Sequence, residues 1–229
     1  MGGVNVKNTM VERVLQIVAP HPCSGCGKVG AILCLYCKYD IVYEPFLGCI
    51  LCGRPQMNGI CEEHSSPIER AFTVGARTGA LESAINRLKF QNTKAAAIDL
   101  AELLDARLPI LPEGTVIIPV PTVRSHIRQR GYDQVELLAK HLSRLRGVSI
   151  TSALTRQTTT TQHLVDRKQR NVQAARAFAL DPSVPVPRGP VLLLDDIVTT
   201  GSTLMAAATQ LSQAGVTVWV ATLAYQPLD

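Results

Sequence analysis

The chain has 229 residues, 46% of them apolar, which is enough for one ordinary folded domain with a buried core plus a smaller module. Its net charge of +5 is mild: it favours anionic ligands such as phosphates and does not by itself indicate a nucleic-acid-binding protein. Aromatic residues make up only 4%, which argues against a protein that binds single strands mainly by stacking successive bases on aromatic rings.

The N-terminal residues do not have the pattern of a secretory signal. The apolar run at 14–19 is short, and Glu12 and Arg13 interrupt the residues before it. No later run has the length and uniformity of a membrane helix. We therefore expect a cytoplasmic protein that is not inserted in a membrane. In that reducing compartment, its seven cysteines are expected to bind metal rather than to form disulfides.

The first predicted element is a short amphipathic helix over 9–18, which leads into a segment rich in Cys, Gly and Pro that ends at about Pro67. This segment has too few periodic apolar positions to form a core of its own. The cysteines recur with the C-x2-C spacing of zinc ligands, so we expect bound metal to stabilise the segment in place of an apolar core. We therefore divide the chain into an N-terminal helix and zinc-binding module at 1–67 and a larger domain at 68–229.

Four closely spaced ligand pairs lie in this module, and Gly27 and Gly53 directly after two of them allow the tight turns that aim sulfur atoms inward. Eight ligands suffice for two tetrahedral zinc ions, with neighbouring pairs sharing an ion; interleaved pairing and a single occupied site stay open. Complete sets of four protein ligands leave no position for water, so they indicate structural zinc. The pairs are Cys23 and Cys26, Cys34 and Cys37, Cys49 and Cys52, and Cys61 and His64.

A different pattern follows Arg70, in which apolar strands without polar alternation are separated by amphipathic helices. Such strands are buried on both faces, so the pattern predicts an α/β fold with a parallel sheet flanked by helices, in which ligands bind at the carboxyl ends of the strands. Asp133 and Glu136 open one helix in capping-box spacing, and Gly215 closes another. The predicted strands span 71–76, 115–121, 191–196 and 216–225, and the helices span 80–90, 94–108, 133–146 and 202–214.

The most informative segment is 191–203, where four apolar residues run into two carboxylates and then into a small, hydroxyl-rich turn. At the end of a strand, Asp195 and Asp196 can accept hydrogen bonds from sugar hydroxyls or help to hold a hydrated magnesium ion. Because the turn leads directly into a helix, backbone N–H groups, hydroxyls and the positive helix end converge on a monophosphate. A ribose 5′-phosphate would fit both features at once, with its ribose hydroxyls at the two aspartates and its phosphate at the turn. The predicted phosphate-binding residues are Thr199, Thr200, Gly201, Ser202 and Thr203.

Several basic residues are candidates for binding pyrophosphate. Arg124, Arg128 and Arg130 follow a predicted strand, and planar guanidinium groups bind phosphate oxygens bidentately and stabilise a leaving pyrophosphate. A solvated charged loop is the alternative interpretation of this segment. The polar and basic stretch at 156–178 has the composition of a mobile lid and equally that of an exposed linker. Arg156 at its start and Lys89 in an earlier helix are further candidates.

These motifs resemble known proteins in two ways, one through a single segment and the other through nearly the whole chain. Segment 191–203 resembles the signature that binds phosphoribosyl pyrophosphate (PRPP) in type I phosphoribosyltransferases, where two acidic residues contact the ribose hydroxyls and the next loop holds the 5′-phosphate. Together with LKF at 88–90, PVP at 119–121, RGYDQ at 130–134 and the cysteine module, it makes nearly the whole chain resemble the ComF family of competence-associated, phosphoribosyltransferase-like proteins. That family usually has Gly-Phe-Asn-Gln in place of GYDQ, and a cysteine in place of His64.

The resemblance implies a type I phosphoribosyltransferase-like sheet, an N-terminal double zinc ribbon, and a role in handling single-stranded DNA during natural transformation. PRPP would bind with Mg²⁺ at Asp195 and Asp196, the catalytic residues of a transferase whose acceptor the sequence does not reveal. Two alternatives stay open. One is a non-catalytic module in which the same site holds a phosphate ligand or a DNA end, and the other is an adaptor whose zinc module recruits a helicase or another DNA-uptake protein.

Overall fold

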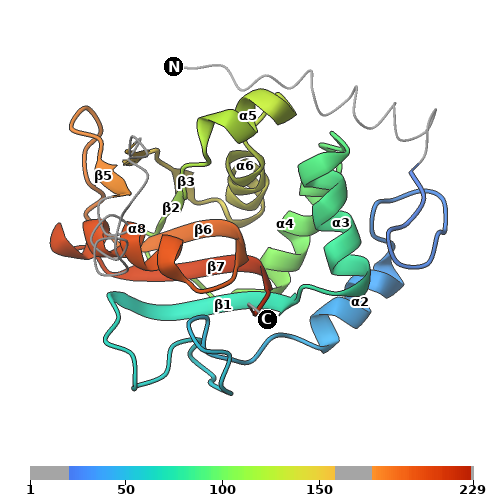
Figure 1. Ribbon diagram of the computed structural model, residues 1–229, viewed down its shortest axis with the longest axis horizontal. Coiled ribbons are helices and arrows are strands. Elements are labelled where there is room, and N and C mark those ends of the chain that lie inside the picture. Colours follow the sequence, from blue (N-terminus) through green and yellow to red (C-terminus); the bar gives the residue numbers. More distant parts are fainter. Residues whose placement is uncertain (1–20, 158–176, 228–229) are drawn as a thin grey trace, which may run out of the picture.

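The computed structural model describes residues 21–157 and 177–227, so the expected helix at 9–18 and the basic stretch at 158–176 fall outside the described residues. A five-stranded parallel sheet forms its centre, in the order β1-β7-β6-β2-β3 (Figure 1). This confirms the parallel sheet predicted from the continuous apolar strands. The strands are β1 (Ile68–Ala76), β2 (Val116–Pro119), β3 (Ser149–Ile150), β6 (Val191–Val198) and β7 (Val218–Tyr225).

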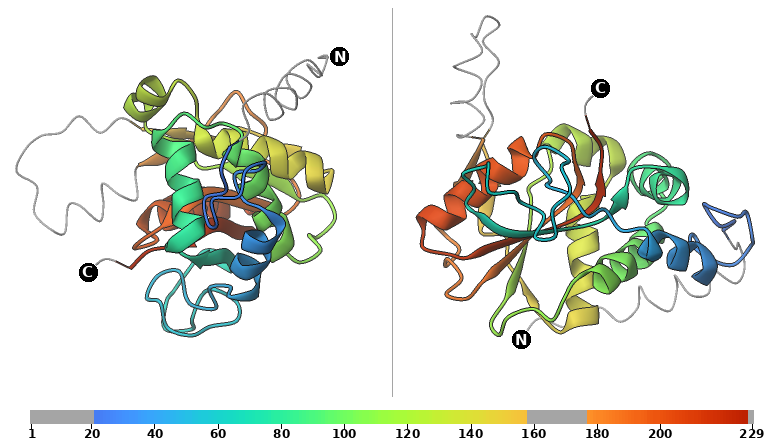
Figure 2. Two further views of the ribbon diagram at one scale, coloured as in Figure 1. Left: turned by 90° about the vertical axis from the view of Figure 1, so that its right-hand side faces the viewer. Right: turned by 90° about the horizontal axis from the view of Figure 1, so that it is seen from below.

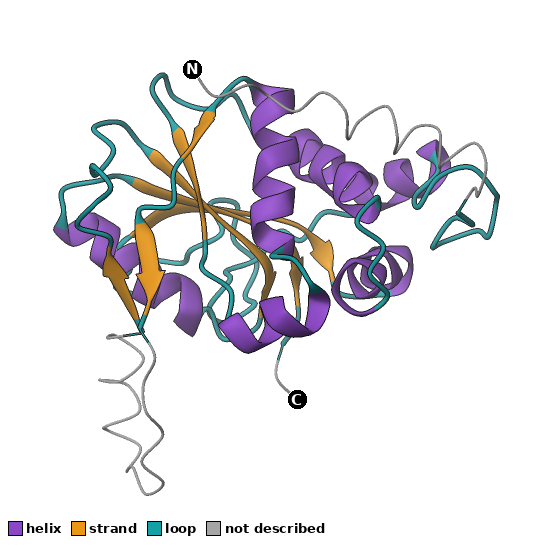
Figure 3. Ribbon diagram, turned by 90° about the horizontal axis from the view of Figure 1, so that it is seen from above, coloured by secondary structure: helices purple, strands orange, loops and turns teal. Residues whose placement is uncertain are grey.

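Helices cover the sheet on both faces, as Figure 3 shows. Successive residues of β6 explain why: Leu192 and Leu194 belong to one apolar cluster, and Val191 and Leu193 to the other, because side chains alternate along a strand. The first cluster is formed mainly with α3 (Gly79–Phe90), α4 (Ala96–Arg107) and α6 (Gln134–Arg146). The second is formed with α8 (Ser202–Gln213) and the antiparallel pair of β4 (Leu154–Arg156) and β5 (Phe178–Leu180).

Several elements differ from the sequence-based expectation, and the short strands β3, β4 and β5 lie outside all the predicted strands. The loop expected after β2 contains the short helix α5 (Arg124–Arg130), which buries no side chain and therefore has no apolar periodicity to detect. Helix α2 (Leu35–Tyr43) lies inside the cysteine-rich segment and buries only Cys37. Strand β6 continues to Val198, so the two aspartates lie within the strand rather than at its end.

The two cysteine segments lie at separate places on the molecule; Figure 2 shows the first in dark blue and the second in cyan. The first packs beside α4, where the backbone N–H of Leu33 donates to Asp99 and Lys38 pairs with the same carboxylate at 2.6 Å. The second lies along β1, where the N–H of Ala71 donates to the carbonyl oxygen of Asn58 at 2.9 Å. Both segments therefore contact the sheet domain directly.

None of the helices in the described ranges combines the length and apolar character that a membrane span requires.

Helix α6 begins with the predicted cap. The side chain of Asp133 accepts from the backbone N–H groups of Val135 and Glu136 and from the hydroxyl of Thr122, while Glu136 pairs with Lys140 instead of completing a capping box.

We expect Asp133→Ala to lower the free energy of unfolding by about 1–2 kcal/mol, because helix N–H groups lose their acceptor. Urea denaturation followed by circular dichroism measures this change. Asp133→Asn is the matched control and should stay close to the wild type, since asparagine caps about as well as aspartate. A fully stable alanine variant would contradict this role of the side chain.

Candidate functional site

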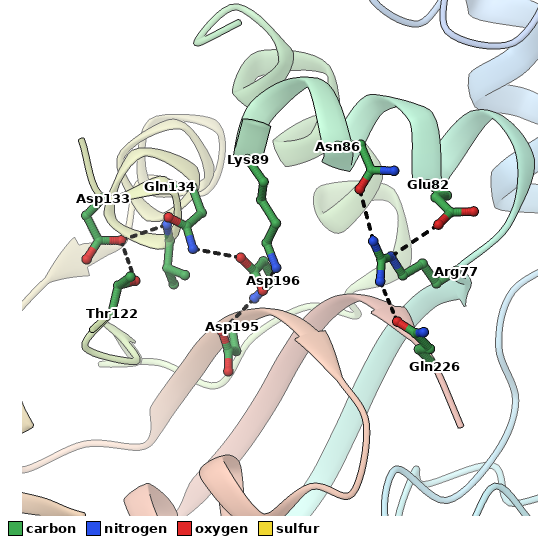
Figure 4. A network of polar contacts seen from close by, with 11 residues as sticks. Arg77, Glu82, Asn86, Lys89, Thr122, Asp133, Gln134, Asp195, Asp196 and Gln226 are labelled. Carbon is green, nitrogen blue, oxygen red and sulfur yellow. Dashed lines mark hydrogen bonds and ion pairs between the residues drawn. The ribbon is translucent and has the colours of Figure 1, made fainter. Parts of the chain in front are cut away.

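A buried carboxylate lies near the carboxyl end of β6. Asp196 is only 5% exposed, and both of its carboxylate oxygens have partners. One lies 2.9 Å from the ammonium group of Lys89 on α3, and the other accepts a hydrogen bond of 2.9 Å from the amide of Gln134 on α6 (Figure 4). The LKF and RGYDQ segments, far apart in the sequence, thus meet at one aspartate.

The neighbouring Asp195 has a different environment. Its carboxylate accepts the backbone N–H of Asp196 at 2.8 Å and lines a small hollow together with the hydroxyl-rich turn. Burial, and then the negative charge of Asp196, raise the pKa of Asp195 above its ordinary value, although Lys89 and Arg156 act in the opposite direction. Asp195, rather than Asp196, is therefore the acid that a ligand in this hollow would meet.

The hydroxyl-rich turn completes the hollow. All five residues predicted to bind phosphate line it: three directly precede α8, and the other two, Ser202 and Thr203, are its first residues. Gly201 has a φ of 70°, and a hydroxyl-to-hydroxyl hydrogen bond of 3.0 Å joins Thr200 to Ser202. The hollow therefore faces the N-terminal end of a helix of twelve residues, where anions are stabilised.

The second cysteine segment contacts this turn at Gly201. A Cβ atom on Gly201 would overlap the side chain of Leu51, which lies between the ligand pair Cys49 and Cys52. Glycine is therefore needed here for two reasons, its left-handed backbone and this close approach. This contact could not be predicted from the sequence, because the C-x2-C spacing indicates metal ligands and does not indicate what the residues between them contact.

The structure brings some of the predicted pyrophosphate-binding residues to the aspartates and leaves others apart. Lys89 contacts Asp196 directly, and the charge of Arg156 acts on Asp195 although its guanidinium lies over the ring of Phe178 at 5.2 Å. Arg130 lies over the ring of Phe90 at 5.6 Å. Arg124 and Arg128 are exposed on α5 and form no ion pair with any carboxylate in the described part of the chain.

Gln134 lies at the site but was not among the binding residues predicted from the sequence. Gln134 is buried and holds Asp196, and its only signal was its place in the RGYDQ segment. A second network lies beside it, in which Arg77 at the end of β1 bonds to Asn86 of α3 and to Gln226 after β7 (Figure 4). Polar side chains of α3 thus contact one residue directly after β1, Arg77, and one near the carboxyl end of β6, Asp196.

Two groups of four side chains could each hold a metal ion. Within each group, the ligand atoms lie within 4.8 Å of one another, and each group consists of neighbouring ligand pairs, as the sequence favoured. The groups are Cys23, Cys26, Cys34 and Cys37, and Cys49, Cys52, Cys61 and His64.

The chemistry of these groups fits a bound cation. Although burial opposes ionisation of Cys23, backbone N–H groups of Cys26, Cys34 and Gly25 lower its pKa to about 6, and the N–H of Cys34 lies 3.3 Å from its sulfur. In the second group, the buried Nε2 of His64 has no hydrogen-bond partner among the described residues. Thiolates and an unpartnered imidazole nitrogen are the donors that zinc prefers.

Comparison with known proteins yields relatives along most of the chain, although no protein-family model matches it. The Competence protein F of Haemophilus influenzae is 32% identical over 215 residues, which cover 88% of this chain and 89% of that protein. The DNA utilization protein YhgH of Escherichia coli is 34% identical over 210 residues, or 86% of each chain. The protein of the same name in Shigella flexneri is 33% identical over an equal length.

We expect Cys26→Ser and Cys52→Ser each to halve the metal content of the purified protein, because each removes one of four ligands from a different group. Elemental analysis of the dialysed protein measures this content. Both cysteines are exposed, so the substitutions should disturb the apolar core little. Complete loss of metal in either variant would instead indicate one site shared by both groups.

Proposed function

The chain belongs to the ComF family, and on that premise we propose that it binds PRPP with Mg²⁺ in the hollow formed by Asp195 and the turn at 199–203. Its relatives are named for competence, in Competence protein F, and for the use of DNA, in DNA utilization protein. We therefore place its biological role in the handling of single-stranded DNA during transformation, in the cytoplasm.

One observation carries the ligand assignment: a carboxylate and a hydroxyl-rich helix start line the same hollow. A ribose 5-phosphate unit presents hydroxyls and a phosphate side by side. Asp195 would accept from the ribose hydroxyls, and the N–H groups and hydroxyls from Thr199 to Thr203 would donate to the phosphate. Asp196 would act with Asp195 mainly by holding Lys89 at the edge of the site.

A transfer reaction at this site would break the bond between the anomeric carbon and pyrophosphate and form a bond from that carbon to a nitrogen nucleophile. Positive charge develops on the sugar and negative charge on the leaving pyrophosphate, so catalysis would rest on positioning and charge stabilisation. Mg²⁺ that accompanies PRPP would neutralise part of the pyrophosphate charge. Lys89 and Arg156 are the protein cations whose charges already act on Asp195, and Arg124 and Arg128 stand on the adjacent α5.

A non-catalytic role is the second candidate, favoured by the name of the DNA utilization proteins among the relatives. In that case, the same hollow would bind PRPP or a DNA 5′-phosphate as a ligand without turnover. The zinc module at 1–67 would then serve as an adaptor for a helicase or another DNA-uptake protein, with the phosphate site in the domain at 68–229.

At about pH 9, where Asp195 is ionised despite its pKa being raised to about 8, we expect Asp195→Asn to weaken the binding of Mg-PRPP by about 10- to 150-fold, the equivalent of about 1.5–3 kcal/mol for hydrogen bonds to a charged group. Isothermal titration calorimetry measures the affinity. Glu69→Gln, an exposed charge change on β1, is the matched control and should bind like the wild type. Equal affinity of Asp195→Asn and the wild type would refute the assignment.

The contact between Leu51 and Gly201 predicts that the two metal groups differ in their effect on this site. We expect Cys52→Ser to weaken Mg-PRPP binding about tenfold. Apparent affinity falls in proportion to the fraction of molecules that are competent to bind, and this figure corresponds to about a tenth of the variant molecules keeping the turn in place. Cys26→Ser, in the distant first group, should keep the affinity of the wild type. The reverse order in the same titration would show that the first group supports the turn.

A further inference from the structure

A second cavity opens beside the proposed PRPP site, between the turn that joins α3 to α4 and helix α5. It encloses about 310 Å³ and is lined by Lys89, Phe90, Asn92, Gln129 and Arg130. This volume is at the lower end of the range of small-ligand sites. Figure 1 shows α5 next to the end of α3 that leads into α4. Lys89 connects the cavity to the proposed PRPP site, because it pairs with Asp196 and its charge also acts on Asp195, which lines that site.

The two chain segments around this cavity carry positive charge alone. Residues 87–98 and 121–132 contain six Lys and Arg residues and neither Asp nor Glu. In the described parts of the chain, Lys89 is the only one of the six that pairs with a carboxylate. A concave surface with one sign of charge attracts ligands of the opposite sign, so the cavity favours an anion.

An exposed aromatic ring distinguishes this cavity from a simple phosphate site. Phe90 is 68% exposed although it lines the cavity, and the guanidinium of Arg130 lies over its ring. The Nη1 atom of Arg130 is buried and has no hydrogen-bond partner among the described residues. A ring available for stacking next to an unpartnered cationic donor matches a nucleotide, which offers a flat base and a phosphate.

We propose that this cavity binds a nucleotide unit, with the base stacked on Phe90 and the phosphate paired with Arg130. This assignment goes beyond the proposed PRPP site and gives Arg130 a ligand other than pyrophosphate. The amide groups of Asn92 and Gln129 line the same cavity and supply donors and acceptors for the edge of a base. The nucleotide can be free or part of a single strand, since both present the same chemistry.

The test is the affinity for a labelled oligodeoxythymidylate, measured by fluorescence anisotropy. We expect Phe90→Ala to weaken binding about 5- to 150-fold, the equivalent of about 1–3 kcal/mol for one stacked base, and Phe90→Trp to retain it. Tyr36→Ala is the matched control, because Tyr36 is 77% exposed on the distant α2. Arg130→Gln should reduce the dependence of log affinity on log salt concentration by about 0.7, the value of one phosphate contact with a single strand.

Thymidine 5′-monophosphate as competitor identifies the source of the ligand: competition near the concentration of the strand indicates a free nucleotide, and its absence indicates a strand. Either result supports the site provided that Phe90→Ala weakens binding. Unchanged affinity of Phe90→Ala, or an equal loss in Tyr36→Ala, would overturn it. Calorimetry with Mg-PRPP separates the two proposals, since Phe90→Ala should bind PRPP normally and Asp195→Asn should bind the oligonucleotide normally.

Discussion

The structure depends on the burial of one carboxylate, that of Asp196, in the middle strand of the sheet. An unpaired charge there would cost several kcal/mol, so each oxygen needs a partner. Lys89 and Gln134 supply these partners from α3 and α6, which ties both helices to the carboxyl end of β6. Because Asp196 is satisfied inside the protein, Asp195 is left as the acid at the hollow.

The cysteine modules add a second constraint, because they contact the sheet domain rather than standing apart from it. In the second cysteine segment, Leu51 contacts the hydroxyl-rich turn and Ile50 shares an apolar cluster with Ile68 of β1. The first cysteine segment lies beside α4, where Leu33 and Lys38 contact Asp99. A metal ion in the second group would therefore hold the loop that contacts the turn, which would link metal binding to ligand binding at the proposed PRPP site.

Local sequence patterns predicted the parallel sheet, the main helices and the grouping of neighbouring cysteine pairs, because strand burial, helix periodicity and C-x2-C spacing are local features. They also indicated Asp195 and the turn that follows it. They could not show that Lys89 and Gln134 share Asp196, or that Leu51 approaches Gly201, since these contacts depend on tertiary packing between distant segments. Helix α5 was missed because it buries nothing.

Two neighbouring sites at one edge of the sheet, one for a sugar phosphate and one for a nucleotide, would link a PRPP-type ligand to the use of DNA named in the relatives. A crystal structure of the protein with Mg-PRPP tests the central claim most directly. The account predicts the 5′-phosphate against the turn at 199–203, the ribose hydroxyls on Asp195, and Asp196 still held by Gln134. PRPP bound elsewhere, or ribose hydroxyls on Asp196 with Asp195 left free, would contradict it.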